Sequence, residues 1–190
     1  MSIVGVTGRA QHGKDTIGKM LIAHGYTRYA FADQLKALAA YINPIIPFTG
    51  GADMVTPWSL ALADYLELVG GWEPAKENPE VRRFLIALGL GVREYIGWDS
   101  WVMACAKAID DDGAHDVVIT DVRFPNEADW IHEQGGIVIR VTRPATEAVD
   151  PTNESERHVA SLTADYDIVN NKDRDHLQQQ VYEAVNDWGM

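Results

Sequence analysis

The feature that most constrains this sequence is a glycine-bounded loop, "GRAQHGKDT", that begins at the eighth residue. The apolar run 2–6 in front of it predicts a buried strand, and residues from about 13 to 24 behind it predict a helix. Gly8 and Gly13 permit sharp turns, so that successive backbone N–H groups can point inward at phosphate oxygens. The helix adds its positive N-terminal end. The order of strand, glycine loop and helix therefore predicts a phosphate-binding loop.

One position of this loop departs from the common pattern. Lys14 is expected to reach the β and γ phosphates as a point charge, but Asp15 follows it where a Mg²⁺-binding Ser or Thr is usual. A carboxylate about 4 Å from a phosphate is unfavourable by several kcal/mol at an intermediate dielectric, unless a cation lies between the two. We therefore predict that Asp15 and Thr16 serve a Mg²⁺ ion, directly or through water. The alternative is that Asp15 is only a first-turn residue favoured by the helix dipole.

The nucleotide is expected to contact every residue of this loop. The predicted ATP-binding residues here are Gly8, Arg9, Ala10, Gln11, His12, Gly13, Lys14, Asp15 and Thr16.

The rest of the chain alternates between strand and helix patterns. The continuous apolar runs "DVVIT" (116–120) and "IVIRV" (137–141) predict strands of a parallel sheet that is covered on both faces. A helix capped by Asp33 is expected over 33–42. The order of elements predicts one α/β domain over 1–190, with helices between its strands.

A helical insertion is expected at about 43–110. Residues 43–56 are rich in Pro and Gly and predict a loop, and 57–71 predict a helix that opens on a proline. Residues 78–97 predict a helix with interruptions at Gly89 and Gly91. A polar segment at about 143–158 lies between the last two predicted strands and is expected to form a lid.

Composition narrows the possible partners and the compartment. The 28 acidic and 16 basic residues give a net charge of −12, which argues against a general DNA or RNA surface. The single cysteine fits a reducing cytoplasm, and neither a signal peptide nor an apolar run of about 18 residues is visible. We expect a cytoplasmic protein without a membrane partner. Any small basic pocket is then informative, because the few arginines must be placed locally.

A second candidate site follows the strand "DVVIT". Asp121 ends this strand, which places it at the carboxyl edge of a parallel sheet together with the phosphate loop. A carboxylate there can bind the water shell of a metal or orient an acceptor. Arg123 lies two residues further on, and its guanidinium fork suits a phosphate. The alternatives are a helix or turn cap for Asp121 and a surface ion pair for Arg123.

Blocks spread across nearly all of the chain resemble the bacteriophage deoxynucleoside monophosphate kinases. They are "GRAQHGKDT", "FADQLK", "RRFLIALGLGVRE" with a following tryptophan, "DVRFPNEADWI", and "NESE" followed by "DYDIVNN". The resemblance implies a P-loop kinase fold, in which the helical insertion covers the acceptor. It also implies ATP and Mg²⁺, and transfer of the γ-phosphoryl group to a deoxynucleoside 5′-monophosphate. The catalytic residues expected from these motifs are Lys14, Asp121, Arg123 and Arg143, with Asp121 as a further metal ligand.

The resemblance also implies substrate-binding residues. Asp33 or Lys36 is expected near the acceptor nucleotide, with helix capping and solvation as the alternative. Of the insertion arginines, Arg93 is expected to contact the acceptor phosphate, whereas Arg82 and Arg83 are expected to be surface charges. Arg123 also serves the acceptor in this reading.

The lid and the last strand supply the remaining expected residues. Arg143 resembles a lid arginine, and Glu156 matches a family glutamate that could fix Arg143 or the lid. The family motif often reads H-x-S-E, and Asn153 stands here in place of its histidine. Asn170 and Asn171 follow the last strand and are expected to pack on the ATP base.

Two other functions stay open at this point. The chain could phosphorylate a modified base within phage DNA, which the acidic balance disfavours. It could also be a non-catalytic nucleotide-binding protein, which the acceptor-side arginines and the lid disfavour. As a kinase it would act on small molecules, in the host cytoplasm if a phage encodes it, without a stable nucleic-acid partner. A homodimer is left open.

Overall fold

The computed structural model describes residues 2–49, 57–144, 158–159 and 161–189. The chain divides into two compact units, one formed by Met1–Phe31 with Val102–Met190 and the other by Ala32–Trp101. Each unit has a hydrophobic core of its own. No helix in the described part of the chain is long and apolar enough to cross a membrane.

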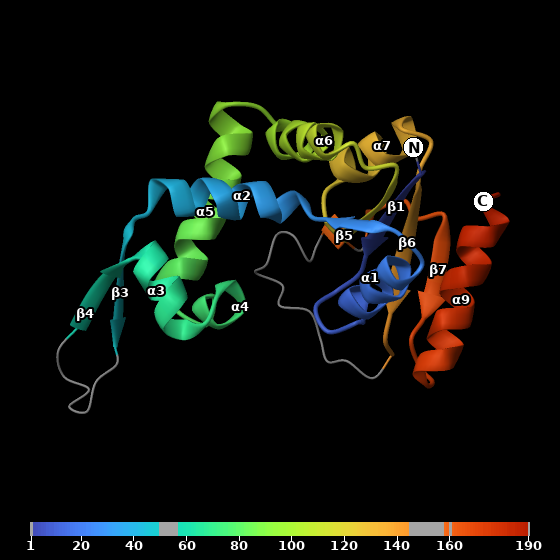
Figure 1. Ribbon diagram of the computed structural model, residues 1–190, viewed down its shortest axis with the longest axis horizontal. Helices are drawn as coiled ribbons and strands as arrows, with labels where there is room; N and C mark the ends of the chain where they lie inside the picture. The colour runs from blue at the N-terminus through green and yellow to red at the C-terminus, as the bar shows by residue number, and fades with distance from the viewer. Residues whose placement is uncertain (1, 50–56, 145–157, 160, 190) are drawn as a thin grey trace. The chain divides into compact units, whose positions relative to one another are not determined.

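The first unit is built on a five-stranded sheet (Figure 1). All four of its strand pairings are parallel, as the two continuous apolar runs predicted. In spatial order the strands are β2 (Thr27–Tyr29), β5 (Asp116–Val122), β1 (Ser2–Thr7), β6 (Ile137–Thr142) and β7 (Tyr166–Val169).

Helices cover both faces of this sheet. On one face Val4 and Val6 of β1 pack with α1 (Lys14–Ala23) and α9 (Arg174–Asp187). On the other face Ile3 packs with α6 (Ser100–Asp112) and α7 (Pro125–Glu133). Because successive side chains of a strand point to opposite faces, β1 serves both cores. The predicted three-layer α/β fold of the P-loop class is confirmed.

The second unit packs helices against a two-stranded antiparallel ladder. Its core contains buried residues from each of its elements but β4. The elements are α2 (Phe31–Ile42, whose first residue belongs to the other unit), β3 (Ile45–Thr49), β4 (Pro57–Ala61), α3 (Leu62–Val69), α4 (Trp72–Ala75) and α5 (Pro79–Tyr95).

Two predictions for this unit are wrong. Residues 45–49 form a strand where a loop was expected, and the helix expected from Pro57 begins only at Leu62. The two strands pair in register, with Phe48 opposite Trp58. Such aromatic cross-strand contacts, and the burial of Ile46, outweigh the local preference of proline and glycine for a loop.

The third difference concerns α5, which continues through both expected interruptions. Asn78 caps its start by accepting a hydrogen bond from Glu80 N at 2.9 Å. Gly89 O accepts a hydrogen bond of 3.0 Å from Nε1 of the buried Trp101. Packing within the unit therefore outweighs the low helix propensity of the two glycines.

Candidate active site

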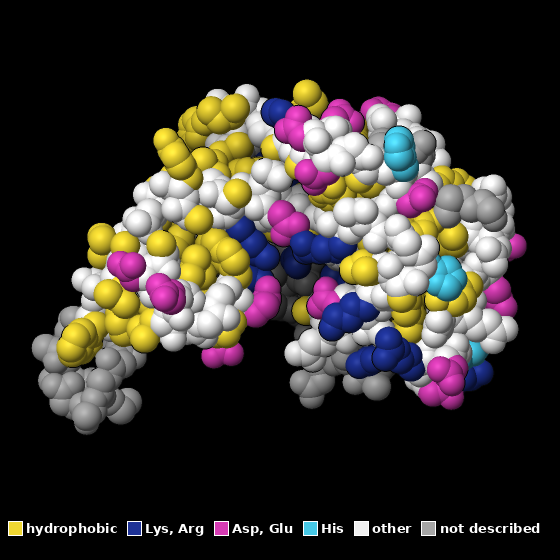
Figure 2. All heavy atoms as spheres, viewed as in Figure 1, with side chains coloured by type: hydrophobic (Ala, Val, Ile, Leu, Met, Phe, Trp, Pro, Cys, Tyr) yellow, Lys and Arg dark blue, Asp and Glu magenta, His cyan; other side chains and the backbone are white. Residues whose placement is uncertain are grey.

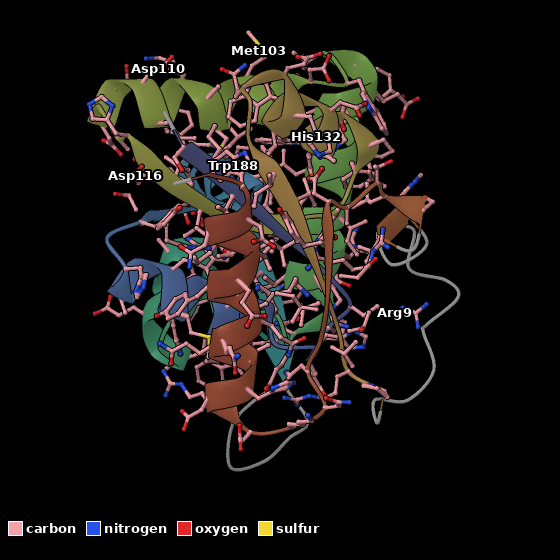
Figure 3. All side chains as sticks on the ribbon, turned by 90° about the vertical axis from the view of Figure 1, so that its right-hand side faces the viewer. Arg9, Met103, Asp110, Asp116, His132 and Trp188 are labelled. Atoms are coloured by element: carbon pink, nitrogen blue, oxygen red, sulfur yellow. The ribbon has the colours of Figure 1, made fainter. Side chains whose placement is uncertain are left out.

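The carboxyl end of the parallel sheet gathers most of the sequence-predicted residues of the first unit. The phosphate loop follows β1, Arg123 follows β5, Arg143 follows β6 and Asn170 follows β7. Figure 3 shows Arg9, in the loop, toward one end of this unit, and Asp116 and His132 toward the other. Parallel strands end at one edge, and in open α/β sheets ligands bind there.

The phosphate loop depends on two glycines. Gly8 has φ 147°, and Gly13, the N-cap of α1, has φ 112° in the left-handed region. A Cβ atom on Gly8 would lie 2.5 Å from Val141 O, and one on Gly13 would lie 2.6 Å from Asn170 Nδ2. Both backbone conformation and space therefore require glycine at these positions. The loop delivers the first turn of α1 to the sheet edge.

The Lys14 side chain folds back over the loop that precedes it and contacts the start of that loop. Its Nζ donates hydrogen bonds of 2.7 Å to Gly8 O and to Arg9 O. The ammonium group thus lies over the loop at the N-terminal end of α1, where its charge adds to the positive end of the helix dipole. A half-buried cation in this position suits a phosphate ligand.

Two buried polar residues fix the middle of the loop. His12, 8% exposed, places Nδ1 3.2 Å from Val141 O. Asn170, 7% exposed, donates from Nδ2 to His12 O at 2.9 Å and from its backbone N to Thr142 O at 2.8 Å. The structure thus places the Asn170 amide against the loop backbone, while its neighbour Asn171 is exposed.

A pocket of about 360 Å³ adjoins the loop on the side of β6. It brings the predicted residues Gly8, Arg9, His12 and Arg143 together. The other described lining residues are Arg140, Val141, Thr142, Pro144 and Val159, so that three arginines and no carboxylate line the pocket among the residues that the structure describes. Figure 2 shows Lys and Arg side chains gathered near α1. In a chain of net charge −12, this local excess of positive charge favours an anionic ligand.

The end of β5 is irregular. The register with β1 shifts between Gly5, opposite Ile119, and Thr7, opposite Val122, which gives β5 one additional residue. Such a bulge re-aims the side chains next to it. Thr7 Oγ1 donates to Val122 O at 2.8 Å and stabilises the pairing beyond the shift.

Asp121 lies within this irregular stretch and acts on the start of α2. Its Oδ1 accepts a hydrogen bond of 2.8 Å from Phe31 N. The helix therefore begins at Phe31, and the prediction that Asp33 caps it is wrong, because Asp33 lies inside the first turn. One Asp121 oxygen thus has the capping role given above as the alternative. A role in metal binding or catalysis stays a prediction.

Arg123 is positioned through its backbone. Glu127, which is only 2% exposed, accepts hydrogen bonds from Arg123 N at 2.7 Å and Phe124 N at 3.1 Å. The second bond is the carboxylate half of a capping box at the start of α7. The ring of His158 lies 5.4 Å from that of Phe124, centroid to centroid. The turn that carries Arg123 is therefore rigidly held.

The predicted acceptor residues of the second unit have local partners. Arg93 is 7% exposed, donates to Trp98 O at 3.2 Å, and places its guanidinium carbon 5.3 Å from the centre of the Trp98 ring. Arg83 forms an ion pair of 2.6 Å with Glu80 on the surface and lowers the pKa of the Glu80 carboxyl. Arg82 is exposed. Asp33 and Lys36 lie half-buried on α2.

The remaining predicted residues either lie at the start of α1 or fall outside the described residues. Asp15 is exposed in the first turn of α1, and Thr16 behind it is half-buried. Glu156 and Asn153 lie outside the described residues, as does most of the expected lid. Among the described residues, no three His, Cys, Asp or Glu side chains come together as a metal-binding group.

Sequence reasoning missed two residues that shape this site. One is Glu127, which stands in the quoted motif "DVRFPNE" at the third helical position, where a glutamate often completes a cap. The other is Arg140 in β6, which pairs with Asp167 at 3.2 Å and donates to Leu162 O. A charged residue inside the apolar run "IVIRV" was the available signal.

A five-stranded parallel sheet whose first strand leads through a glycine loop into a helix defines a phosphate-binding α/β protein. TT1252 from Thermus thermophilus resembles it over 99% of this chain and 97% of its own, with 13% identity and a TM-score of 0.54. This likeness concerns the fold. A shikimate kinase from Aquifex aeolicus aligns over 100% of both chains with 12% identity and a TM-score of 0.49.

A sequence relative comes from a giant virus. A stretch of 71 residues is 46% identical to the "Putative deoxynucleotide monophosphate kinase" of Acanthamoeba polyphaga mimivirus. The match spans 36% of this chain and 36% of the viral protein. No protein-family model matches the chain.

Proposed function

We propose that this protein is an ATP-dependent kinase that transfers the γ-phosphoryl group to a deoxynucleoside 5′-monophosphate. The observation that carries the proposal is the phosphate loop, in which Lys14 lies over the carbonyls of Gly8 and Arg9 at the head of α1. The local identity to the mimivirus protein supports the choice of acceptor.

In the proposed reaction an oxygen of the acceptor 5′-phosphate attacks the γ-phosphorus. The bond from that phosphorus to the β,γ-bridging oxygen breaks, and ADP leaves with the electron pair. The acceptor phosphate is already ionised at neutral pH, so the reaction requires no strong base. The work of the protein is to hold two anions in line and to neutralise their charge.

Three cations are proposed for that neutralisation. Lys14 acts on the β and γ phosphates of ATP, Arg123 on the transferred or acceptor phosphate, and Arg143 from the start of the lid. The pocket that contains Arg143 and Arg9 supports this assignment, because three of its described lining residues are arginines. Closure of the lid would exclude water.

Mg²⁺ is part of the proposal. Asp15 and Thr16 lie in the first turn of α1, after β1, and Asp121 lies near the carboxyl end of β5. Their oxygen donors are of the kind that Mg²⁺ prefers. When bound, the ion neutralises the triphosphate charge. Its presence would also remove the repulsion expected between Asp15 and a phosphate.

The acceptor nucleotide is assigned to the second unit. We propose Arg93 for its phosphate and Asp33 or Lys36 for the rest of the nucleotide, with Glu156 acting on the lid. Asn171 is proposed to contact the ATP base.

An assay of ADP formation from ATP tests the proposal. The protein is incubated with ATP and Mg²⁺, alone and with each of the four common deoxynucleoside monophosphates. We expect ADP formation to depend on at least one monophosphate and to yield the matching diphosphate. ATP binding without acceptor-dependent turnover would instead mean a non-catalytic nucleotide-binding protein. A low-salt mobility-shift titration with duplex DNA serves as the second arm, and tight binding would favour a DNA substrate.

A further inference from the structure

We infer that His12 and Asn170 are positioning residues that hold the phosphate loop in its binding conformation. The inference rests on the proposed function, because it assigns these two side chains to the affinity for ATP. It concerns the loop itself, and it gives Asn170 a different role from contact with the ATP base.

The His12 ring anchors the loop to β6. Its Nδ1 lies 3.2 Å from Val141 O, and a carbonyl oxygen only accepts, so Nδ1 carries the hydrogen. The side chain is 8% exposed, and replacement of the ring would leave a buried acceptor without this donor. Val141 stands two residues before Arg143, so the bond ties the loop to the strand that leads to the lid.

Asn170 anchors the same residue to β7. Its Nδ2 donates to His12 O at 2.9 Å, and its own backbone N donates to Thr142 O at 2.8 Å. The second bond extends the β6–β7 pairing by one residue and fixes where the amide lies. Because Asn170 is 7% exposed, water does not readily replace the donor that its side chain supplies.

The orientation of one peptide group explains why this anchor matters for a phosphate. In a trans peptide the C=O and N–H bonds point in opposite directions. The Asn170 amide holds the His12 carbonyl toward β7, and it thereby turns the N–H of Gly13 away from β7. Gly13 is the N-cap of α1, where backbone N–H groups bind anions.

The close contact between Asn170 and Gly13 leaves little freedom at this point. A Cβ atom on Gly13 would lie 2.6 Å from Asn170 Nδ2, so the amide rests directly on the glycine. A longer side chain than Asn would not fit without moving the loop. An Asp would face the His12 carbonyl with an acceptor in place of a donor.

Two substitutions test the role of the donor. Asn170→Asp keeps the shape and removes the Nδ2 donor, and Asn186→Asp adds the same charge at an exposed asparagine of α9 as the matched control. His12→Phe keeps a ring and removes the donor, and His115→Phe changes an exposed histidine as its control. Should either variant fail to fold, Asn170→Ser or His12→Ala takes its place, because neither shorter side chain reaches the carbonyl that the parent side chain contacts.

The readouts are the Kd of ATP by calorimetry, the KM values of ATP and of the monophosphate, and the melting temperature without nucleotide. We expect Asn170→Asp and His12→Phe to raise the Kd and KM of ATP by about tenfold, or about 1.4 kcal/mol. The KM of the monophosphate should stay within about twofold of the parent, which a general loss of structure would not produce. His12→Gln, which offers a donor again, should recover part of the affinity.

The outcomes separate the inference from the proposed function. If the folded variants bind ATP within about threefold of the parent and their controls, the inference is overturned. It is also overturned if both KM values rise together with a fall in melting temperature. A parent that binds ATP but transfers nothing to any monophosphate overturns the proposed function alone, since the calorimetry still tests the loop.

Discussion

The phosphate loop and the turn after β5 lie at the same edge of the sheet, but their backbones are held in opposite ways. In the loop, side-chain donors bind carbonyl oxygens: Lys14 binds Gly8 O and Arg9 O, and Asn170 binds His12 O. In the turn, carboxylates bind N–H groups: Glu127 accepts from Arg123 N and Phe124 N.

The difference indicates how each region can bind an anion. Side chains that bind the carbonyl oxygens of the loop leave the backbone N–H groups of the loop available to a phosphate. In the turn a buried carboxylate already uses two N–H groups, and its charge repels an anion from that backbone. An anion at the turn must therefore be bound by the Arg123 side chain. Backbone recognition is expected in the loop and side-chain recognition in the turn.

The largest effect is expected for Lys14→Ala. The substitution removes both the cation and the two hydrogen bonds that it makes to the loop carbonyls. We expect kcat/KM to fall by at least about 100-fold, or about 2.7 kcal/mol. Lys19→Ala, which removes an exposed lysine from the same helix, is the matched control. A Lys14→Ala enzyme within about tenfold of the parent would contradict the assignment of the phosphate loop.

Arg123→Lys tests recognition by the side chain at the turn. A lysine keeps the charge but cannot reproduce the two-point fork of a guanidinium. We expect a loss of about 10- to 100-fold in kcat/KM, measured with saturating ATP and varied monophosphate. Arg82→Lys, an exposed arginine of the second unit, should leave the kinetics unchanged. Parental kinetics for Arg123→Lys would remove Arg123 from the site.

The contrast between the two regions also explains what the sequence could predict. The loop was foreseeable because its glycines and Lys14 are adjacent in the chain and imply one geometry. Its anchors were not, because Asn170 is 158 residues from His12, and Val141 is 129 residues away. The same holds for Asp121, which fixes the start of α2 at Phe31 from 90 residues away. The β3–β4 ladder was missed because cross-strand packing outweighed its prolines and glycines.

Glu127→Ala tests how the turn is held. It would leave the N–H groups of Arg123 and Phe124 without their buried acceptor. We expect a loss of about 1–3 kcal/mol in the free energy of unfolding, measured by urea denaturation. Activity should fall by less than about tenfold, because Arg123 keeps its guanidinium. Glu133→Ala removes an exposed glutamate at the end of the same helix and should be neutral. Unchanged stability in Glu127→Ala would mean that water replaces the carboxylate.

Asp15 is the exception within the loop, since it is a carboxylate where the other anchoring side chains are donors. It is exposed in the first turn of α1, so either the helix dipole or a metal explains it. If it serves Mg²⁺, Asp15→Asn keeps one oxygen, loses the charge, and should raise the Mg²⁺ concentration for half-maximal rate by about two- to tenfold. Asp15→Ser, which restores the common hydroxyl, should lose less activity than Asp15→Ala.

The measurement is a Mg²⁺ titration of initial rates at fixed ATP for the parent, Asp15→Asn and Asp15→Ser. A pure dipole role predicts a different result, namely a stability loss of a few tenths to about 1 kcal/mol and an unmoved midpoint. ATP binding without Mg²⁺ sharpens the distinction. Without Mg²⁺, the Asp15 carboxylate and a phosphate of ATP repel each other. Removal of the carboxylate should therefore leave the affinity for metal-free ATP equal or improve it. Unchanged midpoints together with lowered melting temperatures would assign Asp15 to the helix, and the loop would then bind its ligand through donors alone.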